Sequence, residues 1–237
     1  MVAKSFGGKT YSIPKMLKEG NSYFEDDIIG FIFPCYVGSI PTVVEKFLSS
    51  SRFNADYTFA IMTYGNMAFG GTKQFIAISK QNGIKIDYAN QIKMVDNSLK
   101  HYNMEKQIHG LAKKQVGKQI DKIKSDIERK VHNDGRGNVV TSQLSKFGHK
   151  AYRKEIGDCD NLFEVENHCT LCKVCEMVCP VDNIKADEKV NFKGQCIRCY
   201  ACTQNCPSNA IRFNGEKSKT RYRNSDISLK EIILANN

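Results

Sequence analysis

Residues 168–184 read HCTLCKVCEMVCPVDNI, and residues 195–211 read QCIRCYACTQNCPSNAI. Each stretch contains four cysteines and a proline in the spacing C-x2-C-x2-C-x3-C-P. Shifting the chain by 27 residues superposes the four cysteines, the proline and the isoleucine that ends each stretch. This internal repeat predicts two similar units, each made of a strand, a cysteine-rich loop and a short helix.

The cysteine spacing predicts two [4Fe-4S] clusters. Three thiolates at two-residue intervals can bind one cluster, whereas the fourth, set off by three residues and turned away by proline, reaches the neighbouring cluster. Ligation is therefore expected to cross between the two stretches. The first cluster is expected to be bound by Cys169, Cys172, Cys175 and Cys206. The second is expected to be bound by Cys196, Cys199, Cys202 and Cys179.

Structural zinc and a disulfide framework are the alternatives for a cysteine-rich segment. Zinc sites take four ligands from two pairs, which gives no reason for a third cysteine at the same interval or for a duplicated Cys-Pro ending. The spacing therefore favours iron–sulfur clusters. A segment this small buries little apolar surface, so the clusters are expected to supply much of its stability.

The region from about residue 163 to 213 resembles a bacterial ferredoxin with two [4Fe-4S] clusters. The two cysteine stretches carry this resemblance. It implies a carrier of single electrons, and it does not identify the redox partners.

Length and charge limit the function further. The chain has 237 residues, enough for one or two domains, and it shows neither a signal peptide after Met1 nor an apolar run of membrane-spanning length. We therefore expect a cytoplasmic protein without a membrane partner. The net charge is +10, of which residues 1–158 carry +9. No nucleic-acid-binding motif accompanies these charges, so they favour an acidic redox partner over nucleic acid. The sequence leaves the oligomeric state open.

The first half of the chain alternates strands and helices. Residues 27–33 and 57–63 are short apolar runs, typical of parallel strands buried on both faces. A helix capped by Ser39 is expected between them, followed by a helix over residues 72–81 and a short strand over residues 84–87. This order predicts an α/β domain with a doubly wound parallel sheet.

The loops that follow the two strands are candidates for ligand binding. PCYVGSIP (residues 34–41) and TYGNMAFGG (residues 63–71) each place a tyrosine beside glycines, which can hold a flat ring. These loops resemble the FMN-ring loops of flavodoxins, and almost the whole chain resembles the flavodoxin–ferredoxin fusion proteins of anaerobic bacteria. The resemblance implies FMN contacts at Tyr36, Gly38, Thr63, Tyr64, Gly65, Asn66 and Gly70. The alternative is that Tyr36 and Tyr64 merely cover an apolar edge.

The N-terminus departs from the flavodoxin pattern. Residues 1–14, MVAKSFGGKTYSIP, look like the end of the first flavodoxin helix followed by the second strand. The first strand and its phosphate-binding loop, roughly 20 residues, are absent from this pattern. Met1 is therefore interpreted as an internal methionine of a longer reading frame or as the start of a gene remnant. FMN is expected to bind weakly or not at all, unless TYGNMAFGGT serves as the phosphate loop.

We predict four segments from these features. They are a flavodoxin-like domain (residues 1–132), a connector (133–158), a ferredoxin domain (159–214) and a basic tail (215–237) that ends in a short helix. Residues 103–132 are expected to form one long amphipathic helix, and residues 133–138 a flexible break. The histidines show no ligand spacing and are expected to face solvent. Cys35 and Cys159 are given no role.

Electron transfer through two clusters, coupled to FMN if flavin binds, is the leading functional prediction. One alternative is an oxidoreductase that uses flavin and iron–sulfur clusters to act on a small molecule. A second is a metal-stabilised interaction module without redox activity.

Overall fold

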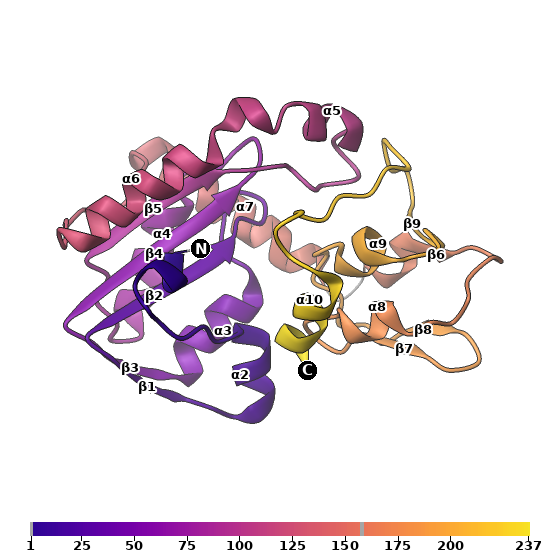
Figure 1. The fold of residues 1–237 in the computed structure, drawn as a ribbon, viewed down its shortest axis with the longest axis horizontal. Helices are drawn as coiled ribbons and strands as arrows, with labels where there is room; N and C mark the ends of the chain where they lie inside the picture. Colours follow the sequence, from indigo (N-terminus) through magenta and orange to yellow (C-terminus); the bar gives the residue numbers. More distant parts are fainter. Residues whose placement is uncertain (1, 157–158) are drawn as a thin grey trace. The chain divides into compact units, whose positions relative to one another are not determined.

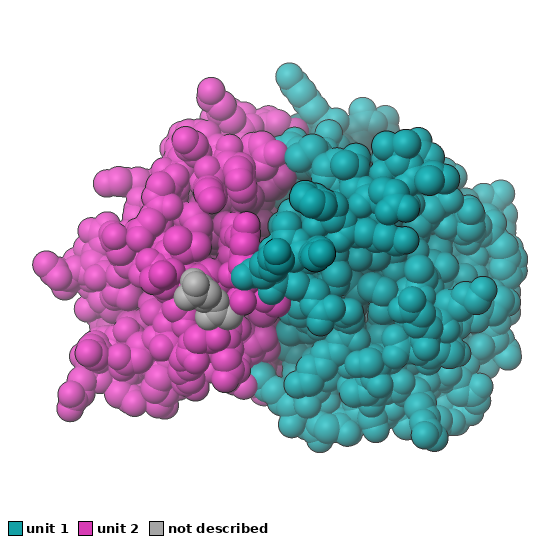
Figure 2. Space-filling view, turned by 180° about the vertical axis from the view of Figure 1, so that it is seen from behind, with its two compact units in different colours: residues 1–95, 111–154 teal, residues 96–110, 155–237 magenta. Residues whose placement is uncertain are grey.

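The computed structural model describes residues 2–156 and 159–237, so the predicted start at Met1 and the last two residues of the predicted connector lie outside the described residues. The chain forms two compact units, coloured separately in Figure 2. Unit 1 comprises Met1–Val95 and Leu111–Lys154, and unit 2 comprises Asp96–Gly110 and Glu155–Asn237.

Unit 1 is built on a parallel β-sheet. Strands β2 (Ile28–Pro34), β4 (Tyr57–Tyr64) and β5 (Tyr88–Lys93) are hydrogen-bonded in the order β2-β4-β5. A short parallel pair, β1 (Tyr23–Glu25) and β3 (Arg52–Asn54), precedes β2 and β4. The two apolar runs at residues 27–33 and 57–63 thus form neighbouring parallel strands, as expected of sequences buried on both faces.

Helices cover both faces of this sheet (Figure 1). Helices α2 (Ile13–Glu19), α3 (Thr42–Ser50) and α4 (Gly71–Gln81) pack with the phenylalanines of β2 on one face. On the other face, α6 (Val116–Glu128) and α1 (Val2–Ser5) cover residues of β4 and β5. The result is a mixed α/β unit with a parallel sheet at its centre.

Three local expectations in unit 1 were wrong. The segment interpreted as a second strand begins α2 at Ile13, with Pro14 in the first helical turn, where a missing N–H costs nothing. The third strand is Tyr88–Lys93 and not residues 84–87. It contains the polar residues Asn90 and Gln91, which are buried because they donate hydrogen bonds to Tyr88 and Thr72, so no apolar pattern indicated this strand.

The third difference is at α3. The N-cap residue is Pro41, whereas the Ser39 hydroxyl lies 2.7 Å from Nδ1 of His149.

The predicted helix over residues 103–132 is three elements. They are α5 (Met104–His109), the 3-10 helix η1 (Ala112–Lys114) and α6. Gly110 ends α5, and Gln115 adopts a left-handed conformation (φ 48°) between η1 and α6, which no continuous helix tolerates. The break matters for the architecture, because α5 belongs to unit 2 and α6 to unit 1.

The predicted connector also differs from the structure, because Val139–Glu155 form helix α7. The segment before α7 is held by Asn133, whose side-chain oxygen accepts hydrogen bonds from the backbone N–H groups of Ala89 (2.9 Å) and Gly135 (3.0 Å). Residues up to Lys154 belong to unit 1.

Unit 2 contains two antiparallel strand pairs. Strand β6 (Phe163–Val165) pairs with β9 (Ile211–Phe213), and β7 (Ile184–Ala186) pairs with β8 (Val190–Phe192). Helices α8 (Val174–Met177) and α9 (Ala201–Asn205) occupy equivalent positions in the two cysteine stretches, and the 3-10 helix η2 (Asp160–Leu162) precedes β6.

The predicted tail is part of unit 2. Its final helix α10 (Leu229–Asn236) begins with a capping box between Ser228 and Glu231. At its C-terminus, the side chains of Asn236 and Asn237 donate hydrogen bonds to the carbonyls of Val178 and Met177. Among the described helices, none combines the length and the apolar character needed to cross a membrane.

Candidate metal centres

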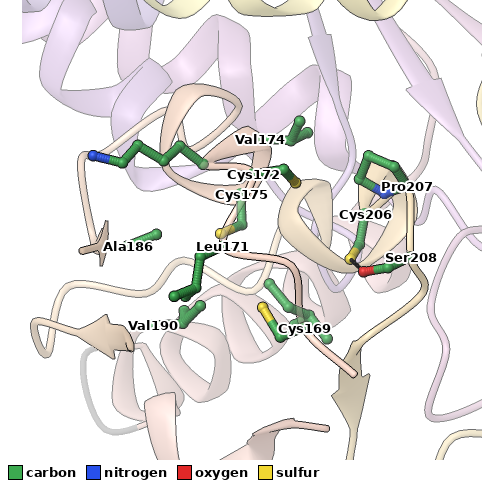
Figure 3. Close-up of a pocket in the computed structure, with 12 residues that line it drawn as sticks. Cys169, Leu171, Cys172, Val174, Cys175, Ala186, Val190, Cys206, Pro207 and Ser208 are labelled. Atoms are coloured by element: carbon green, nitrogen blue, oxygen red, sulfur yellow. Dashed lines mark hydrogen bonds between the residues drawn. The ribbon is translucent and has the colours of Figure 1, made fainter. Parts of the chain in front are cut away.

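Four thiols from both cysteine stretches surround one cavity. Figure 3 shows the sulfur atoms of Cys169, Cys172, Cys175 and Cys206 placed around this space. Apolar side chains that include Val174, Val190 and Ile211 complete its wall. These four cysteines are the predicted first ligand set, including the one residue contributed by the second stretch.

A second cavity contains the other four thiols. It is lined by Cys179, Cys196, Cys199 and Cys202, together with apolar residues such as Phe163 and Ile184. Each cavity is thus lined by four thiols and by apolar side chains, as expected of duplicated sites. Among residues 2–156 and 159–237, no three His, Cys, Asp or Glu side chains are placed to hold a single metal ion.

The electrostatic interactions divide the thiols in the same way. Burial, together with negative charge on Cys206, Cys169 and Cys172, raises the pKa of Cys175 to about 11. Burial likewise raises the pKa of Cys199 to about 12, with Cys179 and Cys196 adding to the effect. Each thiol therefore interacts with members of its own cavity. Because the ligand is the thiolate, binding of an inorganic cluster would displace these protons.

Left-handed backbone conformations repeat around the two cavities. Leu171, Lys173 and Asp182 have φ angles of 52°, 62° and 51°. Their counterparts in the second stretch, Arg198, Tyr200 and Asn209, have φ angles of 56°, 60° and 55°. Such conformations cost about 1–2 kcal/mol at residues other than Gly, Asn and Asp. Their repetition at Leu171, Lys173, Arg198 and Tyr200 indicates that the loops are shaped for a bound group and not by the intrinsic preferences of these residues.

Backbone N–H groups are directed at the sulfur atoms. The N–H of Asn183 donates to Sγ of Cys179 (3.2 Å), and the N–H of Ala210 donates to Sγ of Cys206 (3.3 Å). These two contacts are equivalent in the repeat. At Cys206 burial raises the pKa, but hydrogen bonds from the Ser208 hydroxyl and from backbone N–H groups outweigh it, so the pKa is lowered overall. Both cavities therefore contain hydrogen-bond donors that stabilise the thiolate form of a cysteine.

No sequence pattern indicated a role for Cys159. This residue is buried, and its Sγ–H donates a hydrogen bond to the backbone carbonyl of Cys196 (3.3 Å). A side-chain hydrogen bond with Cys159 is the main cause of the raised pKa of Cys196. Cys159 therefore supports the second cavity without lining it. Its sequence position outside the C-x2-C pattern offered no signal for this role.

The predicted flavin loops are covered by helix α7. The hydroxyl of Ser145 donates to the carbonyl of Gly38 (2.6 Å) and accepts from the N–H of Gly70 (2.9 Å). The ring of Tyr152 meets that of Tyr36 edge to face, with centroids 5.7 Å apart. These contacts place one helix across both loops.

The glycines of these loops are packed against protein atoms. A Cβ atom at Gly38 would lie 2.2 Å from the ring of Phe69, and one at Gly70 would lie 2.8 Å from Cα of Ser142. The remaining predicted contacts are Thr63 and Tyr64 at the end of β4 and Gly65 and Asn66 in the loop that follows. In this arrangement the loops do not fit a flavin ring, because α7 and Phe69 fill the space beside the glycines.

One histidine differs from the expectation of solvent exposure. His149 on α7 is buried, with Nδ1 beside Ser39 and Nε2 3.4 Å from the Glu45 carboxylate. Burial lowers the pKa of His149, and the Glu45 charge only partly opposes this effect. Ser39 is fully buried as well, so this Ser–His–Glu group joins α7 to the loop before α3 and offers no accessible nucleophile.

Comparison with known proteins supports a metal centre in unit 2. Residues 192–212 match the 4Fe-4S binding domain family. The chain is also similar to two uncharacterized proteins of Methanocaldococcus jannaschii. One is 41% identical over 51 residues, 22% of this chain and 21% of the relative, and the other is 38% identical over 56 residues, 24% of this chain and 22% of the relative.

The matches therefore span about a fifth of the length of these curated relatives. No solved structure matches the chain significantly. What the comparisons identify is a ferredoxin-type 4Fe-4S binding segment near the C-terminus.

Proposed function

We propose that this protein transfers single electrons through two [4Fe-4S] clusters bound in unit 2. The observation that carries the proposal is the pair of four-thiol cavities, each completed by one cysteine from the other stretch. When bound, such clusters supply one-electron oxidation and reduction. The 4Fe-4S binding match over residues 192–212 supports the same chemistry.

The residues of the chain have distinct parts in this function. The cavity cysteines hold the clusters, and the apolar walls exclude water, which influences reduction potential. Cys172 is exposed, whereas Cys175 and Cys202 are buried. We propose that electrons are exchanged with partners at the first site, through the side on which Cys172 reaches the surface.

Metal analysis tests the proposal. Anaerobically purified protein should contain about eight iron and eight acid-labile sulfide per chain, because each cluster has four of both. Electron paramagnetic resonance of the reduced protein should show two interacting clusters. Stoichiometric zinc without labile sulfide would exclude the proposal and would favour the metal-stabilised interaction module.

We also propose that unit 1 is a flavodoxin-like domain. The parallel order β2-β4-β5 and the helices on both faces support this assignment. Coupling of the clusters to FMN stays a prediction. It would require the loops at residues 34–41 and 63–71 to adopt another arrangement, because α7 covers them here.

The proposed redox partners are acidic proteins. Residues 1–158 carry 24 basic and 15 acidic side chains, a net charge of +9. Opposite charge accelerates association, and added salt screens it. The rate of electron exchange with an acidic ferredoxin or flavodoxin should therefore fall as ionic strength rises. A rate independent of salt would show that charge does not select the partner.

A further inference from the structure

The segment after β9 returns across unit 2 and is fixed at several points. The N–H of Lys217 donates to the carbonyl of Leu99 (2.9 Å), and the side-chain amide of Asn209 donates to the carbonyl of Lys219 (3.1 Å). The hydroxyl of Thr220 donates to the Glu105 carboxylate (2.5 Å). This segment is therefore anchored by α5 and its preceding loop as well as by the second cysteine stretch.

The residues on either side of Arg221, Thr220 and Tyr222, are both held by hydrogen bonds. Thr220 precedes Arg221, and the N–H of Tyr222 donates to the side-chain oxygen of Gln204 (2.7 Å). Gln204 lies on α9, between Cys202 and Cys206. The backbone on either side of Arg221 is thus tied to structures that also position cluster ligands.

The Arg221 side chain is largely buried, with 12% of its surface exposed. Its Nη2 lies 3.0 Å from the Glu216 carboxylate, and its Nη1 donates to the carbonyl of Ser218 (3.3 Å). Its Nε–H, also buried, has no hydrogen-bond partner among the described residues. A buried donor without a partner costs about 1–3 kcal/mol, which favours a bound acceptor at this position.

Two largely buried arginines share one buried carboxylate. Arg212 and Arg221 both pair with Glu216, and all three side chains are at most 12% exposed. Arg212 has a further, partly exposed partner in Glu166 at 3.7 Å. Among the described residues, Arg221 forms its ion pair with Glu216, a buried carboxylate that it shares with Arg212, whereas the second carboxylate, Glu166, lies beside Arg212.

Thiolates in the two cavities would be further negative partners of Arg221. Burial and the neighbouring Arg212 lower the pKa of Arg221 to about 10, while Cys206 and Cys202 act against this lowering. Cys206 lines the first cavity and Cys202 the second. Arg221 is therefore within electrostatic reach of ligands of both predicted clusters.

We propose that Arg221 is a charge partner of both clusters, and that its guanidinium raises their reduction potentials. The inference rests on the proposed function. Reduction adds one negative charge to a cluster, and a fixed positive charge in a poorly solvated site favours the more negative state. Arg221 binds no iron and is a tuning residue that acts through the ligands Cys206 and Cys202.

Redox titration of the cluster-loaded, full-length protein tests this proposal. We expect Arg221→Gln to shift the reduction equilibrium of the clusters at least tenfold toward the oxidised state, which is about 59 mV for a one-electron couple. Arg221→Lys, which keeps the charge, should shift it less. The matched control is Arg223→Gln, which removes the same charge from an exposed residue two positions later and should leave the potentials unchanged.

A second variant distinguishes charge from structure. Glu216→Gln removes the carboxylate shared by the two arginines, so it should raise the potentials, in the opposite direction to Arg221→Gln. A merely structural role would lower iron content in both variants without opposite shifts. If Arg221→Gln loses its clusters, the Glu216→Gln variant provides the test: a raised reduction potential would support the charge role of Arg221, and a lowered or unchanged potential would overturn it.

The outcomes separate the two proposals. Wild-type protein without iron and sulfide would refute the electron-transfer function. Intact clusters with unchanged potentials in Arg221→Gln and Glu216→Gln would overturn the role of Arg221 and leave the proposed function standing.

Discussion

Cys206 and Cys175 line the same cavity, although Cys206 closes the second cysteine stretch and Cys175 belongs to the first. Charge on Cys206 contributes to the raised pKa of Cys175. Each half of the repeat therefore completes the site of the other. Neither half can form a four-thiol cavity alone.

Crossed ligation predicts reciprocal effects of two cysteine substitutions. Cys179→Ala should chiefly impair the cluster at Cys196, Cys199 and Cys202, because Cys179 lines their cavity. Cys206→Ala should instead impair the cluster at Cys169, Cys172 and Cys175. Spectra of the two variants, with iron content, would assign each loss. Loss of the cluster within the same stretch as the mutated cysteine would contradict the assignment.

Removal of iron should destabilise unit 2 selectively. Its strands have three residues each, and its loops contain the six left-handed residues, so the proposed clusters would be the main contribution that offsets the backbone cost. Hydrogen exchange after anaerobic chelation should show lost protection in residues 159–213. Strands β2 and β4 of unit 1 serve as the internal control and should stay protected. Retained protection in unit 2 would show that the polypeptide alone stabilises it.

FMN should not bind stoichiometrically to this chain. Helix α7 hydrogen-bonds to both loops predicted to contact the flavin ring, through Ser145 to Gly38 and Gly70. Fluorescence titration with FMN should therefore show no tight binding, and the purified protein should lack the flavin absorption bands. Tight binding at one flavin per chain would show that α7 leaves these loops.

Two glycine substitutions should change stability in opposite directions. A Cβ atom at Gly148 would lie 2.3 Å from the carbonyl oxygen of Val37, so Gly148→Ala should destabilise unit 1, by on the order of 1–3 kcal/mol. Gly117 on α6 has no atom within 4 Å of that position, and Gly117→Ala should stabilise the helix by up to about 1 kcal/mol. Urea denaturation measures both changes. If Gly148→Ala changed the unfolding free energy in the same way as Gly117→Ala, α7 would not pack closely on Val37.

Stability should fall in mild acid because of His149. Its folded pKa lies below the usual value near 6.5, so unfolding takes up a proton once the pH falls below about 6.5. This contribution to stability is complete above the unfolded pKa and is lost as pH falls toward the folded pKa. His149→Gln should weaken the dependence of the unfolding free energy on pH in the range from about 7.5 to about 5.5. The exposed His109 provides the control, and its substitution by Gln should leave the slope unchanged.

The sequence by itself determined the grouping of the thiols in unit 2 and the strands at the centre of unit 1. Ligand spacing is a local property, so C-x2-C-x2-C-x3-C-P predicted which thiols would be grouped, and the two cavities contain those groups. Strands β2 and β4 are likewise continuous apolar runs, which only a sheet buried on both faces accommodates.

Tertiary structure decided the features that depend on distant partners. Helix α7 lies where a connector was expected, because the contacts of Ser145 and His149 are with residues far away in the sequence. Arg221 lies in a basic tail, and hydrogen bonds of its neighbours to Glu105 and Gln204 bring it near the predicted cluster ligands. Strand β5 could not be predicted from an apolar pattern because it contains polar residues such as Asn90. The hydrogen bonds that permit the burial of these residues exist only in the folded chain.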